Sequence, residues 1–423
     1  MNATPEVPLF VGIDTARKSL MIGCQDATGT QVGRVKEFTN DLPGAQELEA
    51  YLLIQLEEGG FTKVVIGTEA TSFYDFHILE FLAQSEALSK YTPLFYRLNP
   101  KLVNGFKKVH TYRTKNDRKD ALLIASRLRF GELPPPYQPN MPHLPLQRMT
   151  RFRAQTVRSL TAEQNRFVGL LFLKFSAYTS IKPFSNTFGA TSTAFIEEFF
   201  SPDEVLNMPI EKLVEFLVQK GRNRFTDPEA VVKKVAQVAR ESYRLRPQLN
   251  QSVNLVLSLM YKNIQTPKTT IKQLDKAIEE EFEGFSSVLM SIPGIGPVYA
   301  AGIYAEIGDI SRFPGQAQLA RYAGLTWTEH QSGDFRAQET RLIKAANSYL
   351  RYYLVEATNS VKNREPEFGA FYTKKYHEVS KHQHKRALVL TARKLVRLIY
   401  ALEKQKRLYQ PKSTYLQAKE NQN

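Results

Sequence analysis

The chain has 423 residues, of which 57 are Lys or Arg and 42 are Asp or Glu, so its formal net charge is +15. Hydrophobic residues make up 42% and charged residues 23% of the sequence, a composition that is typical of globular proteins and excludes a disordered chain. The single cysteine, Cys24, excludes an internal disulfide and a cysteine-rich zinc site.

The amino-terminal part of the chain alternates strand and helix patterns. Short β-branched or alternating runs predict strands over 9–15, 19–26, 31–38, 63–68 and 94–98. Runs with apolar residues at helical spacing predict helices over 43–56, 73–88 and 116–129. The resulting order, β-β-β-α-β-α-β-α, predicts a ribonuclease-H-like (RuvC-like) α/β domain over residues 1–131.

A proline-rich linker follows over 132–146, because closely spaced prolines remove backbone donors and stop helices. Long helical patterns over 147–175 and 228–262 then predict a helical arm over 147–282, which suits a coiled coil between protomers. Within the arm, residues 181–227 have the irregular or short-helical pattern of an insertion.

The remaining sequence predicts a mostly helical domain over 283–409 and a polar tail over 410–423. The small residues of 300–308 suit a helix that packs closely against a neighbour. The last helix, over 384–409, combines an apolar side with a strongly basic opposite side.

The amino terminus lacks the basic start and apolar stretch of a signal peptide. Apolar runs elsewhere in the chain, such as 168–173, are too short to span a bilayer. We therefore expect a cytoplasmic protein with no membrane partner.

Four carboxylates fall at positions where they could meet. Asp14 lies in an apolar strand, Glu69 ends a second strand, and Asp117 and Asp120 share one face of the helix that begins near residue 116. Taken singly, each has an ordinary structural explanation, as a turn former, a strand-end acid, a first-turn acid or half of a surface ion pair. Taken together, they would repel one another strongly, and divalent cations are the natural compensation.

A pair of Mg²⁺ ions suits such a cluster, because two ions about 3.5 to 4 Å apart stabilise the attacking and leaving oxygens of a phosphodiester displacement. The basic surplus of the chain points to the same substrate, since neutralising phosphates releases condensed counterions. Basic residues also recur beside aromatic ones, which suits contact with both phosphates and bases. On these grounds the predicted nucleic-acid contacts include Lys107, Lys108, Arg113, Lys115, Arg151, Arg153 and Arg351.

Two features of the carboxy-terminal region have weaker patterns. Gly294 and Gly296 have the spacing of a turn between helices, whose following amides can bind a phosphate without reading sequence. Ser332 and Gly333 on their own predict a loop, and a serine hydroxyl needs activation before it can act as a nucleophile.

The sequence resembles the transposases of the insertion sequence one-ten family, also known as bridge-RNA-guided recombinases, over a little over half of its length. In the first matching region, the motif residues of the family's RuvC-like DEDD domain lie within 10–16, 69–74, 99–100 and 115–121. Ser72 and Asn116 depart from the usual Gly and Thr. The second region, similar to the family's transposase-twenty domain, includes 289–308, 313–326, 331–333, 341–344 and 350–351. Trp327, Gln338 and Ala346 depart from its pattern.

The resemblance implies a DNA recombinase whose four metal-binding acids are Asp14, Glu69, Asp117 and Asp120. It implies that Ser332 is a nucleophile that forms a covalent phosphoserine, and that Arg341 and Lys344 are basic residues of the same domain. It further implies a dimer or tetramer whose active site is shared between subunits. The implied partners are target DNA, donor DNA and a structured guide RNA.

Two other functions remain open from the residues alone. A metal-dependent nuclease or junction resolvase would use water in place of Ser332. A non-catalytic scaffold would bind nucleic acid through its basic helices alone. A nucleotide-dependent enzyme is disfavoured, because neither a dinucleotide-binding glycine motif nor a Walker loop is present.

Overall fold

A computed structural model describes residues 6–70, 73–109, 117–134, 136–138, 141–327, 331–332, 335–336, 342–343 and 346–411. The chain divides into two compact units, one formed by 1–144 with 311–314 and the other by 145–310 with 315–423. Of the described helices, none is both long enough and apolar enough to cross a membrane.

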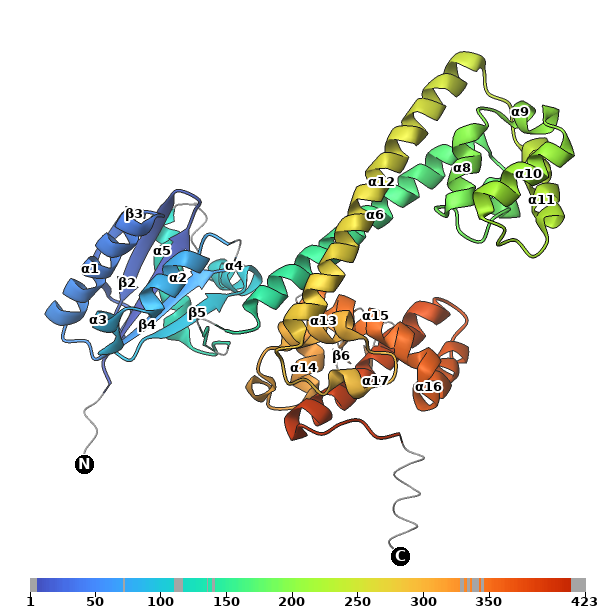
Figure 1. The fold of residues 1–423 in the computed structure, drawn as a ribbon. Helices are drawn as coiled ribbons and strands as arrows, with labels where there is room; N and C mark the ends of the chain where they lie inside the picture. Colours follow the sequence, from blue (N-terminus) through green and yellow to red (C-terminus); the bar gives the residue numbers. More distant parts are fainter. Residues whose placement is uncertain are drawn as a thin grey trace, which may run out of the picture. The chain divides into compact units, whose positions relative to one another are not determined.

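The first unit contains a five-stranded sheet in the order β3-β2-β1-β4-β5 (Figure 1). β1 pairs antiparallel with β2, and β2 pairs antiparallel with β3, whereas β4 runs parallel to both β1 and β5. The strands are β1 (Pro8–Thr15), β2 (Ser19–Gln25), β3 (Gln31–Thr39), β4 (Lys63–Glu69) and β5 (Leu94–Leu98). This topology confirms the predicted ribonuclease-H-like fold.

Helices cover both faces of this sheet. α1 (Leu42–Glu58), α2 (Phe76–Ala83) and α3 (Glu86–Ser89) contribute to the apolar core that contains Val11 of β1 and Ile66 of β4. α4 (Pro100–Val109) and α5 (Asp117–Phe130) contribute to a second core, which contains Val65. Alternation along each strand therefore assigns odd-numbered residues of β1 to the α1 side and even-numbered ones to the α5 side.

Three helices differ from the sequence prediction. α4 was not predicted, and the predicted helix over 73–88 is divided where the Ser85 side chain caps α3 by accepting the Leu88 amide. The predicted helix over 228–262 stops at Glu241 and restarts at Pro247. Arg244 stabilises this break, since its guanidinium donates to the carbonyl oxygens of Ala239, Arg240 and Ser242.

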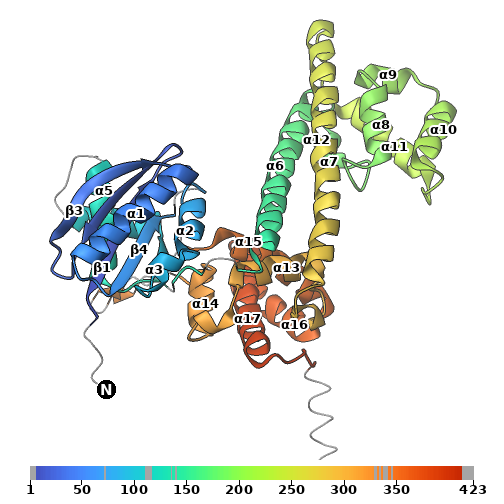
Figure 2. The ribbon, with the colours of Figure 1, turned by 60° about the vertical axis from the view of Figure 1, so that its left-hand side comes forward.

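The second unit contains a long antiparallel helix pair, α6 (Leu144–Lys174) and α12 (Pro247–Phe282), visible in Figures 1 and 2. Arg153 near the start of α6 pairs with Asp275 near the end of α12. At the opposite end, Lys174 bonds to Asn254. The predicted arm is thus a helix pair within one chain, and a coiled coil between protomers stays a prediction.

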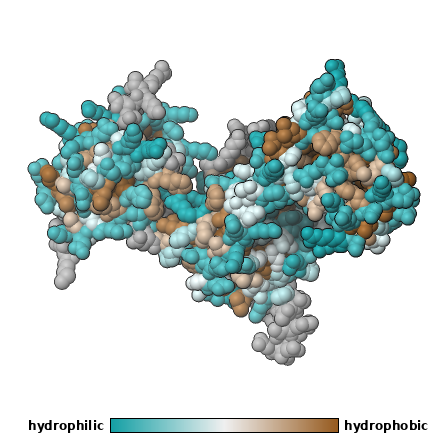
Figure 3. Space-filling view, turned by 45° about the horizontal axis from the view of Figure 1, so that its top comes forward, coloured by the Kyte–Doolittle hydropathy of each residue, from teal (hydrophilic) through white to brown (hydrophobic). Residues whose placement is uncertain are grey.

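A helical module connects the two arm helices. It consists of α7 (Tyr178–Ile181), α8 (Ala190–Glu198), α9 (Pro202–Asn207), α10 (Ile210–Gly221) and α11 (Pro228–Glu241). α11 lies outside the predicted insertion over 181–227, yet it packs against α7, α9 and α10. Figure 3 shows apolar patches within the polar surface on this side of the molecule, and exposed apolar residues here include Phe172, Phe200, Leu255 and Leu259.

The carboxy-terminal region is mostly helical, as predicted. Its elements are η1 (Leu289–Ser291), α13 (Pro297–Ile307), η2 (Ile310–Arg312), α14 (Gln316–Tyr322), β6 (Gln331–Ser332), β7 (Phe335–Arg336), α15 (Ser348–Arg364), α16 (Pro366–His377) and α17 (Gln383–Gln405). Close packing of the small-residue helix is confirmed, because a Cβ built on Gly302 of α13 would lie 2.5 Å from the Tyr353 ring of α15. The predicted domain boundaries themselves stay predictions.

Candidate active site

Asp14 and Glu69 lie at neighbouring positions on adjacent strands. β1 and β4 are parallel, and Ile13 is in register with Thr68, so the residues that follow, Asp14 and Glu69, reach the same edge of the sheet. Both also belong to the α5 side of their strands by alternation. The carboxyl end of parallel strands is where open α/β sheets bind ligands.

A glycine in β1 lets α5 approach this edge. A Cβ built on Gly12 would lie 2.1 Å from the Ala121 carbonyl oxygen and 2.5 Å from the Ala125 amide nitrogen, so only glycine leaves room for the helix. Gly23 in β2 and Gly67 in β4 meet α5 in the same way, through Leu122 and Leu128. This close contact brings the first turn of α5, with Asp117 and Asp120, to the strands that carry Asp14 and Glu69.

Three of the acids lie close enough for their charges to influence one another. Burial raises the pKa of Glu69 above its ordinary value, and the negative charges of Asp14 and Asp120 raise it further. Lys107 of α4 acts in the opposite direction. Its ammonium group lies 2.5 Å from Asp120 Oδ1, and both side chains are partly buried.

These side chains fit a divalent cation by their chemistry, because they are hard oxygen ligands whose mutual repulsion calls for positive charge. In the present arrangement Lys107 supplies that charge to Asp120. No three of the His, Cys, Asp and Glu side chains that the structure describes lie close enough to hold one ion. Asp117 begins α5, but its side chain lies outside the described part.

An ion pair with a buried carboxylate, which the sequence analysis missed, supports the same edge. Arg97 of β5 binds the Asp75 carboxylate through Nε at 2.5 Å and Nη2 at 2.8 Å, and the Thr68 hydroxyl lies 3.1 Å from it. Asp75 is 1% exposed. Since Thr68 precedes Glu69, this pair fixes the end of β4. Asp75 has no sequence signal beyond its position just before a helix.

The predicted serine lies in a short hairpin of the second unit. Ser332 in β6 pairs with Phe335 in β7, and its side chain lies outside the described part. An antiparallel bridge joins Trp327 to Leu342, at the base of the segment that carries the hairpin. Arg341 and Lys344 lie outside the described residues.

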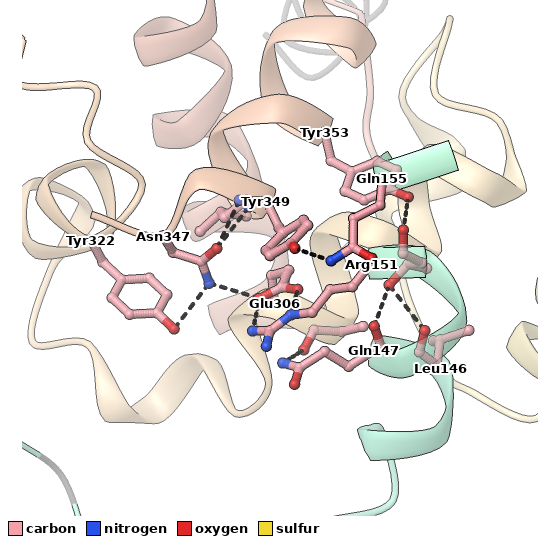
Figure 4. A network of polar contacts seen from close by, with 12 residues as sticks. Leu146, Gln147, Arg151, Gln155, Glu306, Tyr322, Asn347, Tyr349 and Tyr353 are labelled. Atoms are coloured by element: carbon pink, nitrogen blue, oxygen red, sulfur yellow. Dashed lines mark hydrogen bonds and ion pairs between the residues drawn. The ribbon is translucent and has the colours of Figure 1, made fainter. Parts of the chain in front are cut away.

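Three predicted nucleic-acid contacts are engaged within the protein. Arg151 binds Glu306 at 2.6 and 2.8 Å (Figure 4), and Arg153 binds Asp275. Arg351 donates to two backbone carbonyls. Arginine and aromatic residues do meet here, because the guanidinium of Arg151 lies 5.1 Å from the centre of the Tyr349 ring. Contact of these three arginines with nucleic acid stays a prediction.

The other predicted contacts have varied surroundings. Lys108 is exposed on α4, whereas Lys107 lies in the carboxylate cluster. Gly294 has a φ of +98°, and a Cβ there would lie 2.8 Å from the Val361 amide, so packing against α15 already requires this glycine. Gly296 caps the start of α13 with nothing within 4 Å of a built Cβ. Arg113 and Lys115 lie outside the described residues.

Family models match two regions of the chain. A DEDD transposase model of the IS110 type matches residues 11–175, and the model of the transposase IS116/IS110/IS902 family matches residues 286–373. Together they cover more than half of the chain. The chain belongs to this transposase family. The predicted resemblance is thus confirmed, and a DNA-cleaving or DNA-recombining enzyme is the function that family membership supports.

Relatives of this transposase include proteins of bacterial insertion elements. It is 26% identical to the insertion element IS116 uncharacterized 44.8 kDa protein of Streptomyces clavuligerus, over 73% of this chain and 76% of the relative. It is 24% identical to the mini-circle putative transposase for IS117 of Streptomyces coelicolor, over 79% and 80%. A pilin gene-inverting protein of Moraxella bovis is 32% identical over 34% of this chain and 47% of its own.

Among solved structures, this transposase is similar to RuvC of Thermus thermophilus. The match has 16% sequence identity and a TM-score of 0.23, and it covers 30% of the transposase and 99% of RuvC. DEDD domains generally use divalent metal ions, which agrees with the carboxylate cluster in the first unit.

Proposed function

We propose that this transposase cleaves and rejoins DNA with Asp14, Glu69, Asp117 and Asp120 as ligands of two Mg²⁺ ions and Ser332 as nucleophile. The proposal rests on the parallel register of β1 and β4, which brings Asp14 and Glu69 to one edge of the sheet, and on the nearby charge of Asp120, which together with Asp14 raises the pKa of Glu69. Bound Mg²⁺ would neutralise the negative charge that develops on the phosphodiester. The protein itself would hold the carboxylate oxygens near one another through the close contact of Gly12 with α5.

Ser332 would carry out the covalent step. Its Oγ forms a bond to phosphorus, the bond from phosphorus to one deoxyribose oxygen breaks, and the hydroxyl proton is passed to a base as the departing oxygen takes up a proton. The phosphoserine keeps the energy of the broken bond for rejoining. By resemblance to the family, the site is completed by the RuvC-like domain of one subunit and the serine domain of another, in a dimer or tetramer.

Sequence recognition would be delegated to a structured guide RNA that pairs with target and donor DNA. The protein then needs only contacts to backbone and shape, which the formal net charge of +15 favours. Exposed basic residues such as Lys108 suit this role. Sequencing the RNA that copurifies with the transposase tests it, and the absence of a specific element-derived transcript would count against guidance.

The catalytic proposal is tested by incubating the transposase with Mg²⁺, guide RNA and end-labelled DNA, followed by a denaturing gel. We expect a protein-linked DNA strand from the unchanged protein and from the control Ser286→Ala, an exposed serine, but none from Ser332→Ala. Free 5′-phosphate ends without a linked species would favour a nuclease that uses water. Binding independent of Mg²⁺ with no cleavage would favour a scaffold.

A further inference from the structure

The segment that carries Ser332 leaves the helical domain after α14 and returns before α15. Its two ends are joined by backbone hydrogen bonds, with the Ile343 amide 3.0 Å from the Thr326 carbonyl oxygen and the Asn347 amide 2.8 Å from that of Tyr322. The bridge between Trp327 and Leu342 continues this pairing. The serine segment thus has a defined base, whose described residues are 322–327, 342–343 and 346–347.

One side chain bonds to both sides of that base. Arg351, in the first turn of α15, donates from Nε to the Ala323 carbonyl oxygen at 3.2 Å and from Nη2 to the Ile343 carbonyl oxygen at 3.3 Å. A planar guanidinium fixes the angle between its donors. This rigid group therefore helps to set the distance between the outgoing backbone at Ala323 and the returning backbone at Ile343.

The backbone leaves room for this guanidinium at Gly324. Gly324 has a φ of +68°, a backbone conformation that residues with a side chain rarely adopt. A Cβ built there would lie 2.3 Å from Arg351 Nη2. Any other residue would thus strain the turn and push the guanidinium away.

The start of α15 is itself fixed to the core of the unit. The Asn347 side chain accepts the amides of Tyr349 and Leu350 at 3.0 Å and donates to Glu306 at 2.7 Å (Figure 4). Glu306 is 2% exposed and is held by Arg151. Arg351 therefore extends from a rigid helix start, so it can hold the Ala323 and Ile343 carbonyl groups in fixed positions.

We propose that Arg351 is a positioning residue that holds the two ends of the Ser332 segment in register, and so directs the serine toward the scissile phosphate. The catalytic part of this inference rests on the proposed function of Ser332, whereas the clamp itself does not. Loss of the guanidinium would let the ends of the segment separate. A misplacement of about 1 Å can cost about 100-fold in rate.

The test compares Arg351→Gln and Arg351→Lys with Arg364→Gln, which changes an exposed arginine at the other end of α15. Hydrogen–deuterium exchange is measured for the peptides that contain Thr326 and Ile343, and the rate of covalent adduct formation and DNA affinity are measured in parallel. We expect Arg351→Gln to speed exchange at the Ile343 amide and to slow adduct formation about 100-fold with unchanged DNA affinity. Arg351→Lys, whose ammonium cannot make the same planar contact with both carbonyls, falls between.

Hydrogen–deuterium exchange tests whether Arg351 clamps the segment, and the rate of adduct formation tests whether the clamp positions the serine. Unchanged protection of the Ile343 amide in Arg351→Gln would overturn the clamp, and faster exchange with an unchanged adduct rate would overturn its positioning role. If Ser332→Ala still formed the adduct, or if no adduct formed at all, the proposed function would fail. The exchange data would then still decide whether Arg351 holds the segment.

Two further measurements separate positioning from general stability. Gly324→Ala keeps Arg351 but removes its space, so the same faster exchange and slower adduct formation are expected. Added methylguanidinium should partly restore the adduct rate of Arg351→Ala, because it can occupy the vacated place. No restoration, together with a normal adduct rate in Gly324→Ala, would contradict the proposal.

Discussion

The Lys107 ammonium lies 2.5 Å from the Asp120 carboxylate, inside the group of acids that raises the pKa of Glu69. A lysine at this point neutralises one of the proposed metal ligands. A divalent ion bound at the proposed site would therefore compete with Lys107 for Asp120.

Replacing Lys107 by Met should strengthen Mg²⁺ binding. Removal of the competing cation is expected to lower the dissociation constant at least about fivefold, the equivalent of about 1 kcal/mol. Isothermal titration of the DNA-free protein with Mg²⁺ measures the change, and Lys108→Met, at the exposed neighbouring position, is the control. Weaker binding would mean that Lys107 organises the site instead of competing for it.

Replacing Asp120 by Asn should abolish strand cleavage without unfolding the protein. The amide keeps the shape of the side chain but loses the charge that a metal ion requires. Cleavage of labelled DNA and the melting temperature are measured together, with Glu47→Gln at an exposed position of α1 as control. Cleavage at the normal rate would remove Asp120 from the proposed site.

Replacing Gly12 by Ala should force α5 away from β1. The added methyl group would lie 2.1 Å from the Ala121 carbonyl oxygen, and overpacking of this kind costs about 1 to 3 kcal/mol. Denaturant unfolding measures the loss. The control is Gly105→Ala in α4, where a built Cβ meets nothing within 4 Å and the free energy of unfolding should rise slightly. Equal effects at both glycines would argue against the close contact.

Replacing Arg151 by Gln should destabilise the protein more than it weakens nucleic-acid binding. Glu306, 2% exposed, would be left as a buried charge without its arginine, at a cost of about 3 to 5 kcal/mol. Lys108→Gln should instead leave stability unchanged and reduce the salt dependence of nucleic-acid affinity by about one phosphate contact. Melting curves measure the stability of both variants, and binding at several salt concentrations measures their nucleic-acid affinity. Unchanged stability with weaker nucleic-acid binding in Arg151→Gln would instead indicate that Arg151 contacts nucleic acid.

Lys174 should make stability depend on pH. Burial lowers the pKa of Lys174 from 10.5 to about 8, so between these values the unfolded chain binds more protons and stability rises with pH. The full gain is about 3 kcal/mol by pH 10.5, and none of it is present below pH 8. Unfolding of the unchanged protein and of Lys174→Met is measured across this range, and the free energy of unfolding of the unchanged protein should rise by about 3 kcal/mol relative to that of Lys174→Met. A constant difference would show that Lys174 has an ordinary pKa.

The sequence by itself determined the five strands of the first unit and the helices α1 and α5, because alternation and helical spacing are local properties of these segments. It also identified Asp14, Glu69, Asp117 and Asp120 as candidate partners. It did not reveal α4, whose polar surface and internal Gly105 weaken the helical pattern, or the break before Pro247.

Only the tertiary structure decided what these side chains contact. Lys107, Arg151, Arg153 and Arg351 have the same sequence signal as solvent-exposed basic residues, yet they bind carboxylates or backbone carbonyls. Lys107 lies 13 positions from its partner Asp120, and Arg151 lies 155 positions from its partner Glu306. The local sequence around a basic residue does not show which distant carboxylate it will contact. Packing of Gly12 against α5 and of Gly324 beside Arg351 also joins residues that are distant in sequence, which is why these contacts could be established only from the folded chain.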